Sequence, residues 1–228
     1  MKSKMVSSAS ILEFFLSLAI NKASAVSAGA IHEVSSPQGL QWGPCKLDAE
    51  HANTTFPVQC AKLTVPLDYI DSSNNRTIDL DLIKYPAQKE PKRGSILLNF
   101  GGPGQDGLNS MVDYIPLMAP TTGGYHDLVS FDPRGTGNTL RFACWPEDTT
   151  GYYANLISTQ AGSADTAVGK IWAESQIVSD KCYTQLKDIG DYVGMAFVAR
   201  DMMSIVDALG EDGMLRYWGI SGGTCYKP

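Results

Sequence analysis

A short stretch near the end of the chain limits the possible fold more than any other. Residues 215–218 indicate a brief strand, and Gly219-Ile220-Ser221-Gly222-Gly223 follows it directly. This is the G-x-S-x-G pattern, in which the backbone turns sharply from a strand into a helix and presents the serine on a strained turn. Gly219 and Gly223 suit a turn where the two backbones approach closely. The pattern predicts that Ser221 is a nucleophile at the edge of a parallel sheet.

A second glycine-rich turn supports this interpretation. Residues 95–100 (SILLNF) form a continuous apolar run, as expected of a strand buried on both faces of a sheet. Gly101-Gly102-Pro103-Gly104 ends that run, and helical spacing of apolar residues begins at Leu108. We expect this turn to be an oxyanion loop, with the backbone N–H groups of Gly102 and Gly222 facing a carbonyl oxygen held above Ser221.

The same glycines allow one alternative. Residues 102–107 match G-x-G-x-x-G, and Asp132, after the next strand, has the position of a ribose-binding acid in a dinucleotide fold. Pro103, however, lacks one of the N–H groups that a pyrophosphate needs. A secreted protein also encounters little nicotinamide cofactor. We therefore favour the oxyanion loop and expect neither a cofactor nor a metal ion.

The remaining pattern indicates an α/β fold. Residues 59–65 and 77–85 alternate apolar and polar positions around a turn-rich stretch, which predicts two antiparallel strands. Parallel strands are expected at 95–100, 128–131 and 215–218, with crossover helices at 108–118, 164–186 and 193–209. Gly210 is a natural cap for the last helix. Residues 45–228 are thus predicted to form an α/β domain with a helical insertion around 146–191.

The N-terminus indicates secretion. Residues 1–25 combine Lys2 and Lys4, the apolar run 11–20 and a small-residue cleavage site, which together describe a signal peptide. Residues 26–44 then form a polar lead-in. Removing the signal changes the net charge from −6 to −8, because three lysines and one glutamate are lost. An acidic surface argues against a nucleic-acid partner, and no segment predicts a membrane partner.

Cysteines and sequons fit the same compartment. We expect disulfides between Cys45 and Cys60 and between Cys144 and Cys182, because each closes a short local segment and leaves Cys225 over. The triplets beginning at Asn53 and Asn75 are candidate glycosylation sites.

The turn after the expected strand 128–131 favours a structural role. Asp132-Pro133-Arg134-Gly135 predicts a type I turn, with proline second and glycine fourth. We expect Arg134 and Asp132 to form a structural ion pair that supports the loops around the site.

Five sequence blocks carry a family resemblance: CAKLTVPLDY, ILLNFGGPGQDG, HDLVSFDPRGTGNT, VARDMMSIVDALG and YWGISGGT. In this order they resemble the secreted tripeptidyl-aminopeptidase-like and prolyl-aminopeptidase-like branch of the α/β-hydrolases. The resemblance implies a serine exopeptidase that acts on the N-termini of peptide substrates. It also implies that Ser221 is the nucleophile and that Gly102 and Gly222 are the oxyanion donors.

Two departures from that family affect the expected activity. Gly222 stands where the family usually has an aromatic residue, and the family continues beyond the serine with a cap region and the Asp and His of its triad. The available histidines, His32, His51 and His126, lie in positions typical of surface residues. The resemblance therefore implies that residues 45–228 are the N-terminal half of an α/β-hydrolase sheet, incomplete at its C-terminus. The 228 residues are expected to be a truncated, inactive copy. The alternative is a non-catalytic secreted protein that uses the scaffold for binding.

Overall fold

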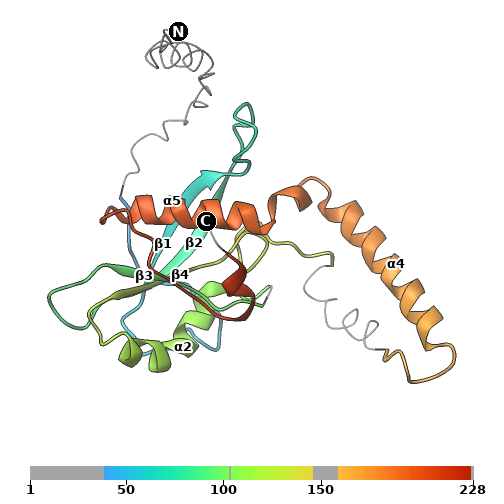
Figure 1. The fold of residues 1–228 in the computed structure, drawn as a ribbon, viewed down its shortest axis with the longest axis horizontal. Helices are drawn as coiled ribbons and strands as arrows, with labels where there is room; N and C mark the ends of the chain where they lie inside the picture. The colour runs from blue at the N-terminus through green and yellow to red at the C-terminus, as the bar shows by residue number, and fades with distance from the viewer. Residues whose placement is uncertain (1–38, 103, 146–158, 227–228) are drawn as a thin grey trace, which may run out of the picture. The chain divides into compact units, whose positions relative to one another are not determined.

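The computed structural model describes residues 39–102, 104–145 and 159–226. The predicted signal peptide, most of the predicted lead-in, Pro103 and the first part of the predicted insertion lie outside these residues. The described part contains a five-stranded sheet with strand order β1-β2-β4-β3-β5 (Figure 1). The strands are β1 (Gln59–Pro66), β2 (Thr77–Tyr85), β3 (Ser95–Asn99), β4 (Asp127–Phe131) and β5 (Tyr217–Gly219).

The sheet has an antiparallel start and a parallel continuation. β2 pairs antiparallel with both β1 and β4, whereas β3 pairs parallel with β4 and β5. This mixed order is the predicted α/β architecture. Because β3, β4 and β5 run in the same direction, the turns that follow them emerge at one edge of the sheet.

Helices cover both faces of the sheet. α2 (Gly107–Thr121) packs on one face around Met111, Ile115, Leu98 and Leu128, and α5 (Met195–Leu209) packs on the other around Met202, Ile205, Leu97 and Val129. Figure 1 shows the two helices on opposite sides of the strands. Neighbouring residues such as Leu82 and Ile83 belong to different cores, because successive side chains of a strand point to opposite faces.

The two core helices have clear end signals. The side chain of Asp106 accepts a hydrogen bond from the Asn109 N–H at 2.8 Å and caps the start of α2. α5 ends at Gly210, which adopts φ of 67°, as predicted for a left-handed C-terminal cap. α2 extends past the predicted 108–118 at both ends, and Pro116 and Pro120 lie within it.

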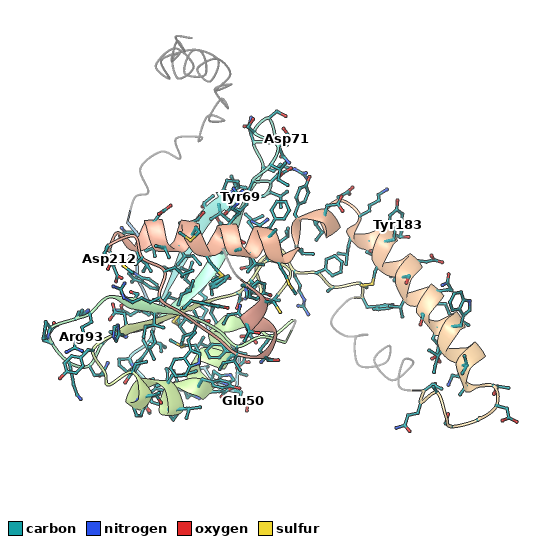
Figure 2. All side chains as sticks on the ribbon, in the orientation of Figure 1. Glu50, Tyr69, Asp71, Arg93, Tyr183 and Asp212 are labelled. Atoms are coloured by element: carbon teal, nitrogen blue, oxygen red, sulfur yellow. A yellow bond between two sulfur atoms is a disulfide. The ribbon has the colours of Figure 1, made fainter. Side chains whose placement is uncertain are left out.

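α4 (Ala167–Leu186) occupies the second part of the predicted insertion and leads through the short 3-10 helix η1 (Gly190–Tyr192) into α5. Four of its large apolar side chains are exposed, those of Val168, Trp172, Ile177 and Tyr183. Cys182 on this helix is bonded to Cys144, and Cys45 is bonded to Cys60, which are the two predicted pairings. Figure 2 shows Tyr183 on α4 among the other side chains. In the described parts of the chain, no helix has the length and apolar character needed to cross a bilayer.

Candidate active site

Ser221 occupies a strained turn at the end of β5. Its φ is 50°, a left-handed value that only Leu140 shares among the non-glycine residues of the described chain. A 3-10 helix, η2 (Ser221–Cys225), begins at this residue. This conformation costs free energy for any residue that has a Cβ atom, and it persists only where the surrounding structure holds it in place. The geometry is that of a serine held at a sharp strand-to-helix turn.

The glycine-rich loop after β3 lies against this turn. Gly101, Gly102 and Gly104 have φ values of 88°, 105° and 99°, which residues with side chains rarely adopt. A Cβ placed on Gly101 would lie 2.8 Å from the Gly222 nitrogen and 3.0 Å from the Ser221 Cβ, and it would overlap the Ile220 carbonyl oxygen. Only a glycine allows this approach. The loop and Ser221 are therefore neighbours at the same edge of the sheet.

Close packing also explains the glycines on either side of the serine. A Cβ on Gly219 would lie 2.6 Å from the Gly223 oxygen, and one on Gly223 would lie 2.7 Å from the Asn99 oxygen. The Tyr217 hydroxyl donates a hydrogen bond of 2.6 Å to the Gly223 carbonyl and ties the turn back to β5. Together with the close approach of Gly101, these contacts hold the loop and the serine turn against each other.

The side-chain carboxylate of Asp132, which follows β4, lies at the N-terminus of α2. Its carboxylate accepts hydrogen bonds from the N–H groups of Gly107 at 2.8 Å, Leu108 at 3.3 Å and Asn138 at 3.2 Å. Burial raises the pKa of this carboxyl group, and the bonds from Gly107 and Asn138 oppose that rise. In a dinucleotide site those helix N–H groups would face a pyrophosphate. Because the protein's own carboxylate uses them, the structure argues against the dinucleotide alternative.

Arg134 is structural, but the predicted partner is wrong. Its guanidinium binds the Asp201 carboxylate through two hydrogen bonds of 2.7 Å, not the carboxylate of Asp132, and both side chains of the pair are fully buried. It also donates to the carbonyl oxygens of Pro66, Leu67 and Tyr192. Asp132 is instead committed to the backbone of α2. Sequence reasoning missed Asp201, although its place in the apolar stripe between Val198 and Ile205 is an available signal.

The turn after β4 also differs from the prediction by one residue. The Thr136 N–H donates to the Pro133 carbonyl at 2.9 Å, so the turn spans Pro133 to Thr136. Gly135 then takes its third position, with φ of 93°. A positive φ at the third position is the mark of a type II turn, which explains why glycine stands there.

Neither described histidine contacts Ser221. His126 Nδ1 lies 3.1 Å from the Gly94 carbonyl, before β3 and therefore at the opposite edge of the parallel strands. His51 lies between two carboxylates, with Nδ1 at 2.7 Å from Asp48 and Nε2 at 3.1 Å from Asp113. These two interactions raise the pKa of His51. His51 is thus a partly buried link to α2, which the sequence pattern did not indicate, and His32 lies outside the described residues.

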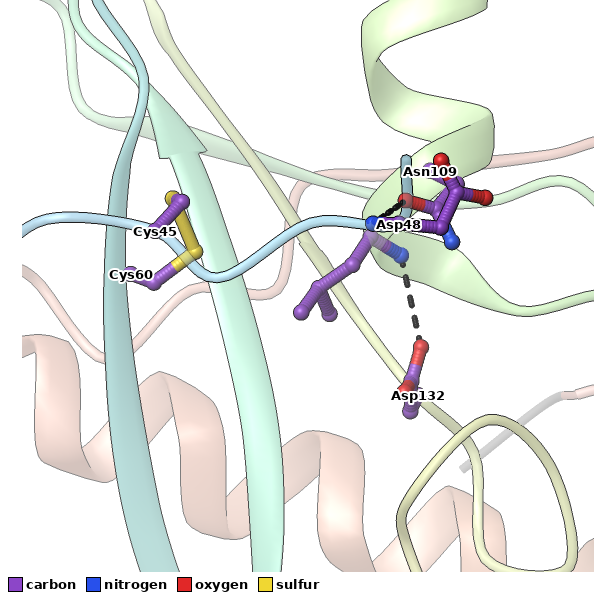
Figure 3. Close-up of a disulfide and its surroundings, with 6 residues drawn as sticks. Cys45, Asp48, Cys60, Asn109 and Asp132 are labelled. Atoms are coloured by element: carbon purple, nitrogen blue, oxygen red, sulfur yellow. Dashed lines mark hydrogen bonds between the residues drawn. A yellow bond between two sulfur atoms is a disulfide. The ribbon is translucent and has the colours of Figure 1, made fainter. Parts of the chain in front are cut away.

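The first disulfide stands beside this link. Figure 3 shows Cys45 and Cys60 near Asp48, whose N–H donates a hydrogen bond of 3.3 Å to the Asn109 side chain on α2. A pocket of about 720 Å³ lies between the segment around Asp48, the start of α2 and the loop after β4. Ser221 does not line this pocket. Asn53 and Asn75 are exposed in loops, and Cys225 is an exposed free thiol.

Known proteins resemble the chain in sequence. It is 31% identical over 188 residues to serine protease Hip1 of Mycobacterium tuberculosis. The match covers 82% of this chain and 35% of the protease. It is 28% identical to the tripeptidyl aminopeptidase of Streptomyces lividans over 82% of this chain and 34% of that enzyme. It is also 30% identical to carboxylesterase B of Mycobacterium tuberculosis, over 74% and 32% of the two chains.

The remaining comparisons are less informative. No protein-family model matches the chain. A cold-adapted esterase from an Arctic intertidal metagenomic library overlaps 82% of this chain and 58% of its own, with a TM-score of 0.36 and 18% identity. That score is too low to support the fold, which follows here from the strand order. The chain spans about a third of the length of the curated relatives it matches. Sequence relatives and sheet topology together identify the chain as a member of the α/β-hydrolase superfamily, in its aminopeptidase-like branch.

Proposed function

We propose that the chain carries the nucleophile and the oxyanion site of a secreted serine hydrolase that acts on the N-termini of peptides. One observation carries this proposal. Ser221 adopts φ of 50° on the turn after β5, and Gly101 packs against that turn with space only for a hydrogen atom. A strained serine beside a second turn of left-handed glycines is costly to fold, and an exposed reactive hydroxyl is a function that accounts for the cost.

The proposed reaction begins with attack of the Ser221 Oγ on the scissile carbonyl carbon. A general base takes the hydroxyl proton as the new C–O bond forms, and the carbonyl oxygen becomes an oxyanion that accepts hydrogen bonds from the Gly102 and Gly222 N–H groups. The C–N bond then breaks, and the leaving amine takes the proton from the base. Water then attacks the acyl carbon of the acyl-enzyme while the base takes a proton from it. The C–Oγ bond breaks, Ser221 takes the proton back, and the acid product leaves.

Neither of the two histidines that the structure describes is the proposed general base. His51 and His126 are bonded elsewhere, as shown above. Since the chain spans about a third of its curated relatives, we infer that the base belongs to a segment corresponding to the rest of those proteins. Loss of a triad member lowers turnover by on the order of 10⁴–10⁶. The 228 residues alone are therefore proposed to be a poor catalyst.

Peptide N-termini are the proposed substrate class because the tripeptidyl aminopeptidase is among the relatives.

Gly222 adds one feature of this chain. It retains the backbone N–H that an oxyanion needs but lacks the side chain that restrains the backbone elsewhere in the family. We propose that its restraint comes from the contacts of Gly101 and Gly223 instead.

The test uses the chain from Val26 onward, treated with a serine-directed fluorophosphonate and compared with a Ser221→Ala control. We expect slow labelling that is confined to Ser221, and faster labelling when a longer form supplies an Asp and a His. Peptide mass spectrometry locates the modified residue. Labelling that is equal in the Ser221→Ala control would refute the nucleophile assignment, and a longer form that stays inert would favour the non-catalytic binding protein. Rapid cleavage of tripeptidyl amides by the 228 residues alone would refute the need for a further base.

A further inference from the structure

Asn99 connects the two glycine-rich turns through three contacts. Its side-chain Oδ1 accepts a hydrogen bond from the Gly101 N–H at 2.9 Å, and its main-chain carbonyl accepts one from the Ile220 N–H, also at 2.9 Å. The same two oxygens lie 2.8 Å and 2.7 Å from the point where a Cβ on Gly223 would be. Only 3% of the residue is exposed. One residue therefore contacts the first glycine of the loop and both flanks of Ser221.

The side chain is needed for the first of these contacts. Gly101 has φ of 88°, and its buried N–H donates to the Asn99 side chain. A buried N–H without an acceptor costs free energy, so the amide oxygen of Asn99 stabilises this conformation of the loop. The donor on Gly101 also fixes the orientation of the amide, since only its oxygen can accept.

We propose that Asn99 is a positioning residue, which sets the Gly101–Gly104 loop and the Ser221 turn at the separation that an oxyanion site requires. The inference rests on the proposed function for its catalytic meaning, although the coupling of the two turns is a property of the fold. Asn99 does not touch the reacting atoms. It acts through Gly101 on one side and through Ile220 and Gly223 on the other.

A neutral amide suits this place better than a carboxylate. Aspartate has the same shape and accepts the same hydrogen bond from Gly101, but its charge would oppose the negative charge that develops on the substrate oxygen. Tyr217 on β5 and Tyr226, which follows η2, are titratable, and burial raises the pKa of each phenol. Both phenols stay neutral at ordinary pH, and Asp132, after the neighbouring strand β4, is the carboxylate on that side. An aspartate at position 99 would add a further negative charge beside the two turns.

The first experiment tests the coupling without any reaction. Amide hydrogen exchange is measured by NMR on the full chain and on its Asn99→Leu, Asn99→Asp and Ser130→Ala variants. Ser130→Ala is the matched control, because it removes another buried hydrogen bond from the same sheet, from Ser130 Oγ to the Leu98 carbonyl. We expect Asn99→Leu to accelerate exchange about tenfold at both Gly101 and Ile220, and Asn99→Asp to restore slow exchange. Acceleration at Gly101 alone, or equal acceleration in Ser130→Ala, would overturn the proposal.

The second experiment tests the consequence for reactivity. The rate of fluorophosphonate labelling at Ser221 is measured as a function of pH, and each variant is expressed as a ratio to the unmodified chain so that titration of any base cancels. We expect Asn99→Leu to lower the ratio equally at all pH values. Asn99→Asp should lower it at neutral pH and recover as the new carboxyl group is protonated. An Asn99→Leu variant that labels as fast as the unmodified chain would contradict the positioning role. A ratio for Asn99→Asp that stays flat with pH would contradict the argument for a neutral amide. An unmodified chain that never labels would count against the proposed function and leave the exchange result to decide on Asn99.

Discussion

At the scale of single residues, Ser221 has a conformation that costs free energy. A left-handed conformation costs a residue with a side chain about 1–2 kcal/mol, and Ser221 adopts it with φ of 50°. Glycine would occupy the same turn without that cost. The serine therefore carries a local cost in stability, which agrees with its proposed role as the nucleophile.

Replacing Ser221 by glycine should stabilise the fold relative to replacement by alanine. Both variants remove the hydroxyl, but only glycine relieves the positive φ, so we expect Ser221→Gly to exceed Ser221→Ala by about 1 kcal/mol in the free energy of unfolding. Urea denaturation of the two variants measures the difference. An alanine variant of equal or greater stability would show that the turn is not strained.

At the scale of elements, the buried pair of Arg134 and Asp201 joins segments that are distant in sequence. Arg134 follows β4, Asp201 lies in the middle of α5, and the guanidinium also holds the end of β1 through the Pro66 carbonyl. Burial raises the pKa of the Asp201 carboxyl group, and the guanidinium opposes this rise. The Tyr69 hydroxyl adds a hydrogen bond to Asp201 at 2.8 Å. The pair thus fixes α5 over the sheet.

Replacing one member of this pair should lower the free energy of unfolding far more than replacing both. Arg134→Leu and Asp201→Leu each leave a buried charge without a partner, and we expect each to lower the free energy of unfolding by about 3–5 kcal/mol. The double variant should be less destabilised than the sum of the two. Chemical denaturation of all four proteins completes the cycle. Additive losses would mean that the two charges do not depend on each other.

The link from His51 to α2 should depend on pH. Hydrogen bonds to Asp48 and then to Asp113 raise the pKa of His51 above its usual 6.5. A raised pKa in the folded state means that the stabilisation is complete below the unfolded-state value and is lost as pH rises through the folded-state value.

We therefore expect His51→Gln to lower the melting temperature at about pH 5.5 and to have little effect at about pH 9. Thermal unfolding at a series of pH values measures this difference between the variant and the unmodified chain. Asp113→Asn serves as the comparison, because it removes only one of the two carboxylates and should show a smaller effect of the same sign. A destabilisation that grows with pH would contradict the assignment.

Much of the fold could be predicted because it depends on local patterns. Alternation over 77–85 matches β2 residue for residue, and the glycine patterns around Gly101 and Ser221 predict two turns that the structure brings together. The partner of Arg134 could not be predicted in this way, because Asp201 is 67 residues distant and the pair forms only when α5 docks. Asn99 was missed for a similar reason. Its role depends on the distance between two turns, which no periodicity records.

At the scale of the whole molecule, the sheet has an open side. Within the residues that the structure describes, β5 pairs with β3 and with no other strand. Tyr217 is half-buried, and Trp218 is 37% exposed. Exposed N–H and C=O groups beside apolar side chains are a template for pairing with another chain.

The 228 residues expressed alone should therefore self-associate. We expect concentration-dependent aggregation that a lysine in place of Trp218 reduces, because charge on an edge strand opposes pairing. Size-exclusion chromatography at several concentrations measures it. Val168→Lys on α4 is the matched control, since it adds the same charge to another exposed apolar site. A monomer at all concentrations, or equal rescue by the control, would exclude β5 as the origin.

The carboxylate of Asp132 at the start of α2 has a consequence for selectivity. Helix N-termini in α/β proteins are ready-made sites for phosphate, and a glycine-rich loop leading into one invites nucleotides. Here the Gly107 and Leu108 N–H groups already hold a built-in anion. The Asp132 carboxylate fills the position that a phosphate would take. We therefore expect phosphate and nucleotides not to raise the melting temperature, because the carboxylate of a single residue takes the helix N–H groups that a phosphate would need.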